Sequence, residues 1–196
     1  NKGAVWILFL NSDKTVKGHQ KISATHGGFT GDLSNNGQTS YFGLSLAGLG
    51  DLDGDGIPDL AVGAPYNTAP TYEGMFFILF LNSDGTVKGH QEISSTQGGF
   101  TGTLGGGELF GWSIASIGDV DGDGATDLAL GQPNVDDGGT NRGAVWILFL
   151  NSDGTVKGHQ KISATHGSFT GTLDDSDNFG YSIAGLGDLD GDGVPD

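Results

Sequence analysis

The chain has 196 residues, including 38 glycines and no cysteine, which excludes disulfide bonds and thiolate chemistry. Its 24 acidic and 8 basic residues give a formal net charge of −16, which disfavours nucleic acid and anionic membranes and favours cations. No apolar run reaches the roughly 20 residues of a membrane span, and the N-terminal residues lack the pattern of a signal peptide.

The predicted elements, taken in chain order, are short strands separated by glycine-rich turns. They cover residues 3–10, 43–49, 60–63, 74–81, 86–93, 112–117, 143–150 and 181–186. The turn at residues 82–85 places Asp-Gly between two strand patterns, which is typical of a β-hairpin. Residues 144–150 are apolar at every position, so both faces of this strand need to be buried. Because no amphipathic helices are available to cover a parallel sheet, we favour antiparallel propeller blades, with a buried helix as the alternative.

Internal repetition organises the whole sequence. Phe-Gly pairs begin at Phe42, Phe110 and Phe179, at spacings of 68 and 69 residues, and an acidic loop follows each pair. We predict an all-β fold with four antiparallel strands in each repeat and the acidic loop between strands one and two. The predicted segments are 1–41 (strands three and four of a split blade, with a connector), 42–109 and 110–178 (two full blades), and 179–196 (the first strand and loop of a further blade).

About three repeats of roughly 69 residues are too few for a closed propeller, which needs about four to eight blades. We therefore predict an incomplete ring that either a longer chain or several copies would complete. Residues 1–31 and 141–171 differ at only three positions, which are residues 2, 14 and 28 of the first copy. Blades that are this similar favour a structural or multivalent role, including that of a filament component.

The acidic loops carry carboxylates at positions 1, 3, 5 and 9 and glycine at positions 4 and 6. Ca²⁺ takes about six to eight hard oxygen ligands, and glycine permits the positive φ angles of a tight loop. Position 7 would contribute its main-chain carbonyl. We predict one Ca²⁺ per loop and three in all, with these ligands: Asp51, Asp53, Asp55, Ile57 and Asp59; Asp119, Asp121, Asp123, Ala125 and Asp127; Asp188, Asp190, Asp192, Val194 and Asp196.

Three other interpretations of the loops fit the sequence less well. An EF-hand closes with glutamate at position 12 between two helices, whereas position 12 here is Val62 or Leu130 and the flanking segments are predicted strands. Mg²⁺ demands stricter octahedral geometry. An acidic turn without an ion would leave four carboxylates to repel one another. The third loop ends at Asp196 and is expected to fray.

Together these residues resemble the FG-GAP repeat, the blade of the integrin α-subunit propeller. The first copy has Phe42-Gly43, its acidic loop and Gly63-Ala64-Pro65 in family order. The second has Phe110-Gly111 and its loop, but Gly131-Gln132-Pro133 stands where Gly-Ala-Pro is expected. The resemblance implies a β-propeller with calcium loops on one rim. It also implies an extracellular or cell-surface location and a role in adhesion or ligand binding, although a few relatives are fused to enzymes.

We expect a non-catalytic, calcium-binding, extracellular propeller segment with a structural or adhesive role, whose partners are other copies or further repeats of the same chain. The alternative is a module that recognises a glycan or a protein, and a hydrolase-associated domain is least favoured. Neither Gly-x-Ser-x-Gly nor His-Glu-x-x-His occurs. Connectors 66–73 and 134–142 should lie on the rim opposite the calcium loops and contribute to a ligand surface.

Lys-Gly-His-Gln recurs at residues 17–20, 88–91 and 157–160, on the predicted outer strand of each blade. We expect the three histidines to be solvated edge residues rather than a shared metal site. The lysines are expected to protect the outer strand against the addition of another strand. The three tryptophans are expected to lie in the core between blades.

Overall fold

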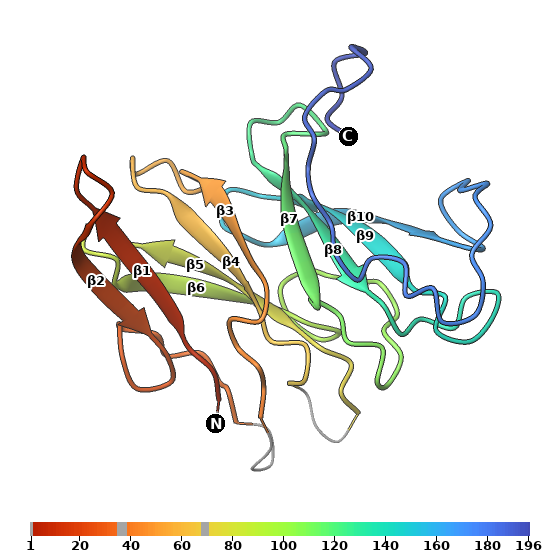
Figure 1. Cartoon of the computed structure of the whole chain (residues 1–196), viewed down its shortest axis with the longest axis horizontal. Helices are drawn as coiled ribbons and strands as arrows, with labels where there is room; N and C mark the ends of the chain where they lie inside the picture. The colour runs from red at the N-terminus through yellow and green to blue at the C-terminus, as the bar shows by residue number, and fades with distance from the viewer. Residues whose placement is uncertain (1, 35–38, 68–70) are drawn as a thin grey trace.

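The computed structural model describes residues 2–34, 39–67 and 71–196, and within these ranges every regular element is a β-strand (Figure 1). The strands are β1 (Val5–Leu10), β2 (Val16–Ile22), β3 (Leu46–Gly50), β4 (Asp59–Gly63), β5 (Phe76–Leu81), β6 (Val87–Ile93), β7 (Ser113–Gly118), β8 (Asp127–Gln132), β9 (Ala144–Leu150) and β10 (Val156–Ser163). Among the described residues there is no helix long and apolar enough to cross a membrane.

Each strand pairs antiparallel with its neighbour in sequence. Strands β3 to β6 form one four-stranded sheet in chain order, β7 to β10 form a second, and β1 and β2 form a two-stranded sheet. The sheets follow one another without closing into a ring (Figure 1). The all-β prediction and the four-stranded antiparallel blade are therefore confirmed, whereas the predicted segment boundaries stay a prediction.

The strand predicted at residues 181–186 is wrong. This segment corresponds in the repeat to β3 and β7, which are hydrogen-bonded to β4 and β8. It has no such second strand within the described residues and stays irregular, with Tyr181 and Leu186 exposed. An apolar pattern alone does not make a strand, because the strand also needs a partner for its main-chain hydrogen bonds.

The main chains of consecutive repeats meet at the Phe-Gly pairs. Gly74 and Gly143 form isolated parallel bridges with Phe110 and Phe179 of the next repeat. Gly74 has a φ angle of +91°, and a Cβ atom on it would collide with the main chain of Phe110. Only glycine satisfies both constraints, which accounts for its recurrence at the start of each strand three.

The core lies between the sheets, and strand three supplies several of its fully buried side chains. Every residue of β5 is buried except the partly buried Phe80. In β9, for which two buried faces were predicted, one face is buried and the other is only partly buried at Ile147 and Phe149. Phe110 lies at the junction of the two full blades, with its ring centroid 4.9 Å from that of Phe100, 5.8 Å from Phe76 and 6.4 Å from Trp146. The expected burial of the tryptophans holds for Trp146, which is 4% exposed, but not for Trp6, which is 51% exposed, and Trp112 is partly buried.

Substitutions of two glycines in the first full blade, Gly63 and Gly48, would show whether the packing between blades contributes to stability. A Cβ atom on Gly63 would meet the main-chain oxygen of Gly111 in the next blade, whereas one on Gly48 would point into open space. We expect Gly63→Ala to lower the free energy of unfolding by about 1–3 kcal/mol because the blades must move apart. Gly48→Ala should change it by less than about 0.5 kcal/mol. Urea denaturation of both variants measures the difference, and equal stabilities would contradict this account of the interface.

Candidate calcium sites

The ninth residue of each full loop is a buried aspartate that begins strand two. Asp59 is 2% exposed, and its carboxylate oxygens accept hydrogen bonds from the N–H of Leu52, 3.1 Å away, and of Leu81, also 3.1 Å away. Leu52 belongs to the acidic loop and Leu81 is the last residue of β5. One carboxylate therefore ties the loop to the end of strand three.

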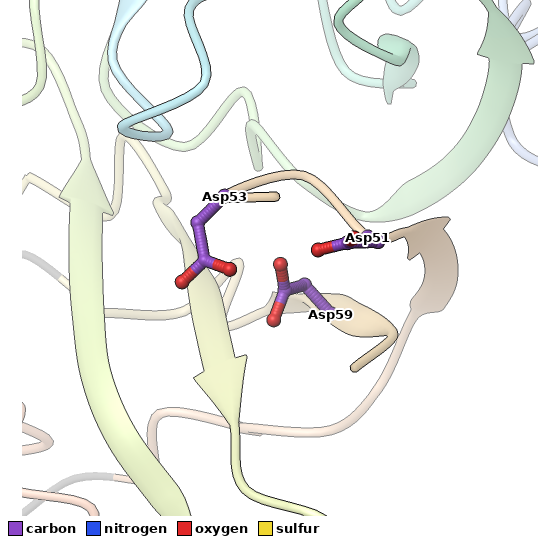
Figure 2. A group of neighbouring side chains, drawn as sticks. All are labelled: Asp51, Asp53 and Asp59. Atoms are coloured by element: carbon purple, nitrogen blue, oxygen red, sulfur yellow. The ribbon is translucent and has the colours of Figure 1, made fainter. Parts of the chain in front are cut away.

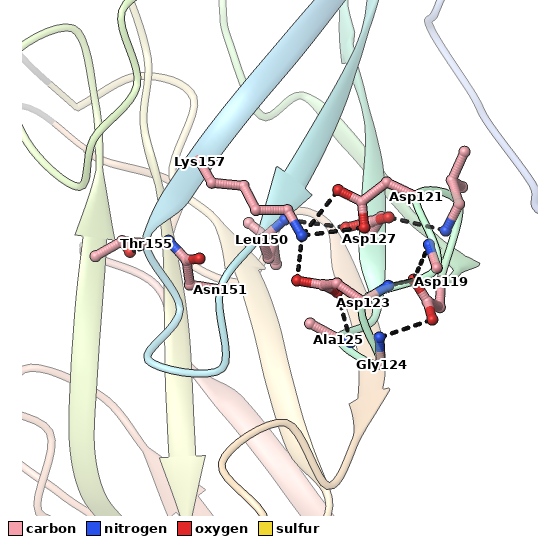
Figure 3. Close-up of polar contacts among 12 residues, drawn as sticks. Asp119, Asp121, Asp123, Gly124, Ala125, Asp127, Leu150, Asn151, Thr155 and Lys157 are labelled. Atoms are coloured by element: carbon pink, nitrogen blue, oxygen red, sulfur yellow. Dashed lines mark hydrogen bonds and ion pairs between the residues drawn. The ribbon is translucent and has the colours of Figure 1, made fainter.

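Asp127 makes the same two connections in the second full blade (Figure 3). It is 0% exposed and accepts hydrogen bonds from the N–H groups of Val120 and Leu150, each at 2.9 Å. Burial raises the pKa of both Asp59 and Asp127 above the ordinary value for aspartate, although these N–H donors act in the opposite direction. Burial of these two carboxylates therefore carries a desolvation cost, and a nearby cation would offset that cost.

Three carboxylates converge in each loop. Figure 2 shows Asp51, Asp53 and Asp59 pointing toward one another. In every loop, one oxygen from each of positions 1, 3 and 9 lies within 4.8 Å of the others. The three groups are Asp51, Asp53 and Asp59; Asp119, Asp121 and Asp127; and Asp188, Asp190 and Asp196. A cluster of hard, anionic oxygens fits a calcium-type cation better than a softer transition metal.

Hydrogen bonds within the loop explain how the sequence builds this arrangement. Asp119 accepts from the N–H groups of Gly122, Asp123 and Gly124 at 2.8, 3.0 and 2.8 Å, which curls the main chain around its carboxylate. Gly122 and Gly124 have φ angles of +79° and +95°, as the glycines at positions 4 and 6 predicted.

Position 5 does not join the converging group. Asp55, Asp123 and Asp192 each accept a hydrogen bond from the N–H of position 7, at 2.8, 2.9 and 2.8 Å. The position 7 side chains differ in exposure: Ala125 is buried, Ile57 is partly buried and Val194 is exposed. The predicted ligand roles of positions 5 and 7 stay predictions.

Two of the outer-strand lysines contact the acidic loops, which the expectation of edge protection did not include. Lys88 Nζ lies 2.7 Å from Asp53 Oδ2 and also contacts Asp55. These hydrogen bonds, that with Asp53 first, raise the pKa of Lys88, and the bond with Lys88 lowers the pKa of Asp55. The sequence pattern placed the lysine on the correct strand but gave no indication of this contact, because it spans more than 30 residues.

The third loop has the same internal hydrogen bonds but lacks the connection to strand three. Asp196 is exposed, and its carboxylate accepts from the N–H of Leu189 at 2.9 Å, which among the described residues is the only main-chain donor to this carboxylate. The loop closes through the Asp196 N–H, which donates to the Gly187 carbonyl at 2.9 Å. This site is therefore built from the loop alone.

The outer-strand histidines are less solvated than predicted in the two full blades. The ring centroid of His90 lies 5.2 Å from Phe29 and 6.0 Å from Phe77, and burial lowers the pKa of His90. His159 packs in the same way against Phe100 and Trp146. Their positions fit a packing role and not a shared metal site.

A second concave site lies on the opposite rim, where strand two connects to strand three. It is a cleft of about 410 Å³, and its lining residues are Thr39, Tyr41, Tyr66, Tyr72, Gly107, Leu109 and Asn134. The ring centroids of Tyr41 and Tyr66 are 4.8 Å apart. Tyr41, Tyr72 and Leu109 have positive φ angles of 55°, 53° and 64°, which non-glycine residues adopt infrequently. The loops that frame the cleft are thus held in unusual conformations.

A comparison with protein families identifies the repeat. The model of the FG-GAP repeat matches residues 42–79 and 110–148, which include the acidic loops of both full blades. The chain contains two FG-GAP repeats. The resemblance inferred from the Phe-Gly pairs and the acidic loops is therefore confirmed.

Relatives of this FG-GAP chain include several integrin α subunits. Integrin alpha-3 of Cricetulus griseus is 35% identical over 195 residues, which cover 99% of this chain and 16% of the relative. Integrin alpha-2 of Mus musculus is 37% identical over 162 residues, 80% of this chain and 12% of the relative. Integrin alpha-5 of Xenopus laevis is 37% identical over 170 residues, 84% of this chain and 15% of the relative. The chain thus spans less than a fifth of the length of these curated relatives.

Proposed function

We propose that this chain is a non-catalytic FG-GAP propeller segment that binds Ca²⁺ in its acidic loops and serves adhesion at the cell surface or outside the cell. The observation that carries the proposal is the convergence of three carboxylates in each loop. Similarity to integrin α subunits over most of the chain favours the adhesive role and the extracellular location. Further repeats or other copies of the chain would complete the propeller, and a filament role stays a prediction.

A cation in each loop would act as a structural clamp. In the full blades the carboxylate at position 9 links the loop to the last residue of strand three. A bound Ca²⁺ would offset the cost of burying that carboxylate and would hold strands one, two and three at one rim. The loop residues would supply charge and hard oxygens, with no catalytic part in the proposal.

Removal of Ca²⁺ tests the proposal directly. We expect a chelator to lower the melting temperature by roughly 5 °C relative to protein in excess Ca²⁺, because ligand binding stabilises only the folded state. Isothermal titration should show one ion per loop, and Mg²⁺ at the same concentration should stabilise less. Equal melting temperatures with and without chelator, together with no heat of binding, would overturn the calcium proposal.

The aromatic cleft on the opposite rim favours a second candidate, which is recognition of a glycan or protein ligand. Tyrosine rings such as those of Tyr41 and Tyr66 offer flat apolar faces with a polar end, which suits both ligand classes. A glycan array and a screen for protein partners, both in millimolar Ca²⁺, test this candidate. Binding that Tyr41→Ala abolishes would support it, and no binding would leave the structural role alone.

A further inference from the structure

Lys88 and Lys157 form ion pairs with carboxylate groups that belong to the converging clusters. Lys88 Nζ lies 2.7 Å from Asp53, and Lys157 Nζ lies 2.8 and 3.0 Å from the two oxygens of Asp121. Asp53 and Asp121 are the third-position members of their converging groups. The same carboxylates therefore face an ammonium group and the proposed cation position.

Both lysines reach the acidic loops from the same position in their blades. The hairpin between strands three and four returns the chain at the calcium rim, and each lysine is the second residue of strand four, on β6 or β10. From there the side chain reaches positions 3 and 5 of the loop, and Figure 3 shows Lys157 directed at Asp121 and Asp123. Because two blades repeat this arrangement, it is a feature of the full blade rather than of one loop.

We propose that Lys88 and Lys157 act as built-in counter-cations that stabilise the ion-free loop and lower its affinity for Ca²⁺. The inference rests on the proposed calcium function and concerns the regulation of that site. The lysine ammonium group, paired with the carboxylates at positions 3 and 5, neutralises part of the negative charge and so reduces the repulsion among the carboxylates of an ion-free loop. When a divalent ion binds, the like charges repel and the flexible lysine side chain withdraws into water, where the remaining repulsion corresponds to a change in affinity on the order of tenfold.

The chain contains two internal references for this effect. Lys17 stands at the matching position of β2, yet among the described residues it forms no ion pair with an acidic loop. In the third loop, Asp190 and Asp192 likewise have no lysine partner within the part of the chain that the structure describes. Lys17 therefore serves as a substitution control, and the third loop as a site that lacks the counter-cation.

Lys157→Met tests the inference against Lys17→Met as the control. Calcium titration is followed by NMR at the amides of Gly124 and Gly56, which donate to Asp119 and Asp51 of the two loops. We expect Lys157→Met to lower the dissociation constant at Gly124 about tenfold, leave Gly56 unchanged and lower the melting temperature in chelator. Lys17→Met should change none of these, and Lys157→Arg should keep the wild-type affinity because it keeps the charge.

An unchanged or weaker calcium affinity in Lys157→Met would overturn the inference, since it would mean that the lysine only positions the aspartates. In that case calcium would still bind the wild-type chain, so the proposed function would stand. Absence of calcium binding in the wild type and in every variant would overturn the proposed function and the inference together.

Discussion

Asp127→Ala is expected to lower the free energy of unfolding by about 3–5 kcal/mol, even in the presence of a chelator. The carboxylate is fully buried and accepts two hydrogen bonds, from Val120 in the loop and from Leu150 at the end of β9. Alanine leaves both N–H groups without their acceptor, and hydrogen bonds to a charged group contribute about 1.5–3 kcal/mol each. Urea denaturation with chelator measures this loss separately from any effect of the cation.

Asp196→Ala is the matched control, because Asp196 occupies the same loop position in the third copy. It is exposed, and its carboxylate accepts from Leu189 alone among the main-chain donors in the described ranges. Its replacement should cost less than about 1 kcal/mol. Asp127→Asn should fall between the two, since it retains one acceptor oxygen and removes the buried charge. Similar losses of stability for Asp127→Ala and Asp196→Ala would contradict the conclusion that the aspartate at position 9 stabilises the fold by linking the loop to strand three.

The loops were predictable from sequence because their geometry is local. Glycine at positions 4 and 6 and aspartate at position 1 lie within a few residues, and their hydrogen bonds close inside the loop. The hydrogen bond from the Leu150 N–H to Asp127 was not predictable in the same way, since the two residues are 23 positions apart. Strand periodicity indicates which face a side chain occupies and says nothing about which distant N–H group it will meet.

Burial was the other quantity that the local sequence could not determine. Trp6 and Trp146 lie in nearly identical segments, yet they are 51% and 4% exposed. Trp146 packs against Phe100 and Phe110 of the preceding connector and the Phe-Gly pair, whereas no preceding blade covers Trp6 within the described residues. The same dependence on a neighbour explains why residues 181–186 do not form the predicted strand. In a repeat protein, each unit is stabilised by the units beside it.

Phe110→Ala should therefore lower the free energy of unfolding by about 3–5 kcal/mol, because it removes the ring at the centre of the interface between the two full blades. Phe110 is 0% exposed and its ring contacts Phe76 from the first full blade and Phe100 and Trp146 beside the second. The lost side chain leaves a cavity lined by aromatic groups that are fixed by their own strands and cannot readily close it. Urea denaturation followed by tryptophan fluorescence measures the loss and also reports on Trp146.

Phe179→Ala provides the control for this interface, since Phe179 is the same residue of the next Phe-Gly pair. It is partly buried, and its ring stacks 5.2 Å from the exposed ring of Phe169. We expect a loss of about 1–2 kcal/mol, because little of the cavity term applies to a side chain that solvent already reaches. Equal losses at the two positions would mean that the Phe-Gly phenylalanine stabilises its own turn. A much larger loss at Phe110 would mean that it stabilises the contact between blades, so that stability grows with each blade added.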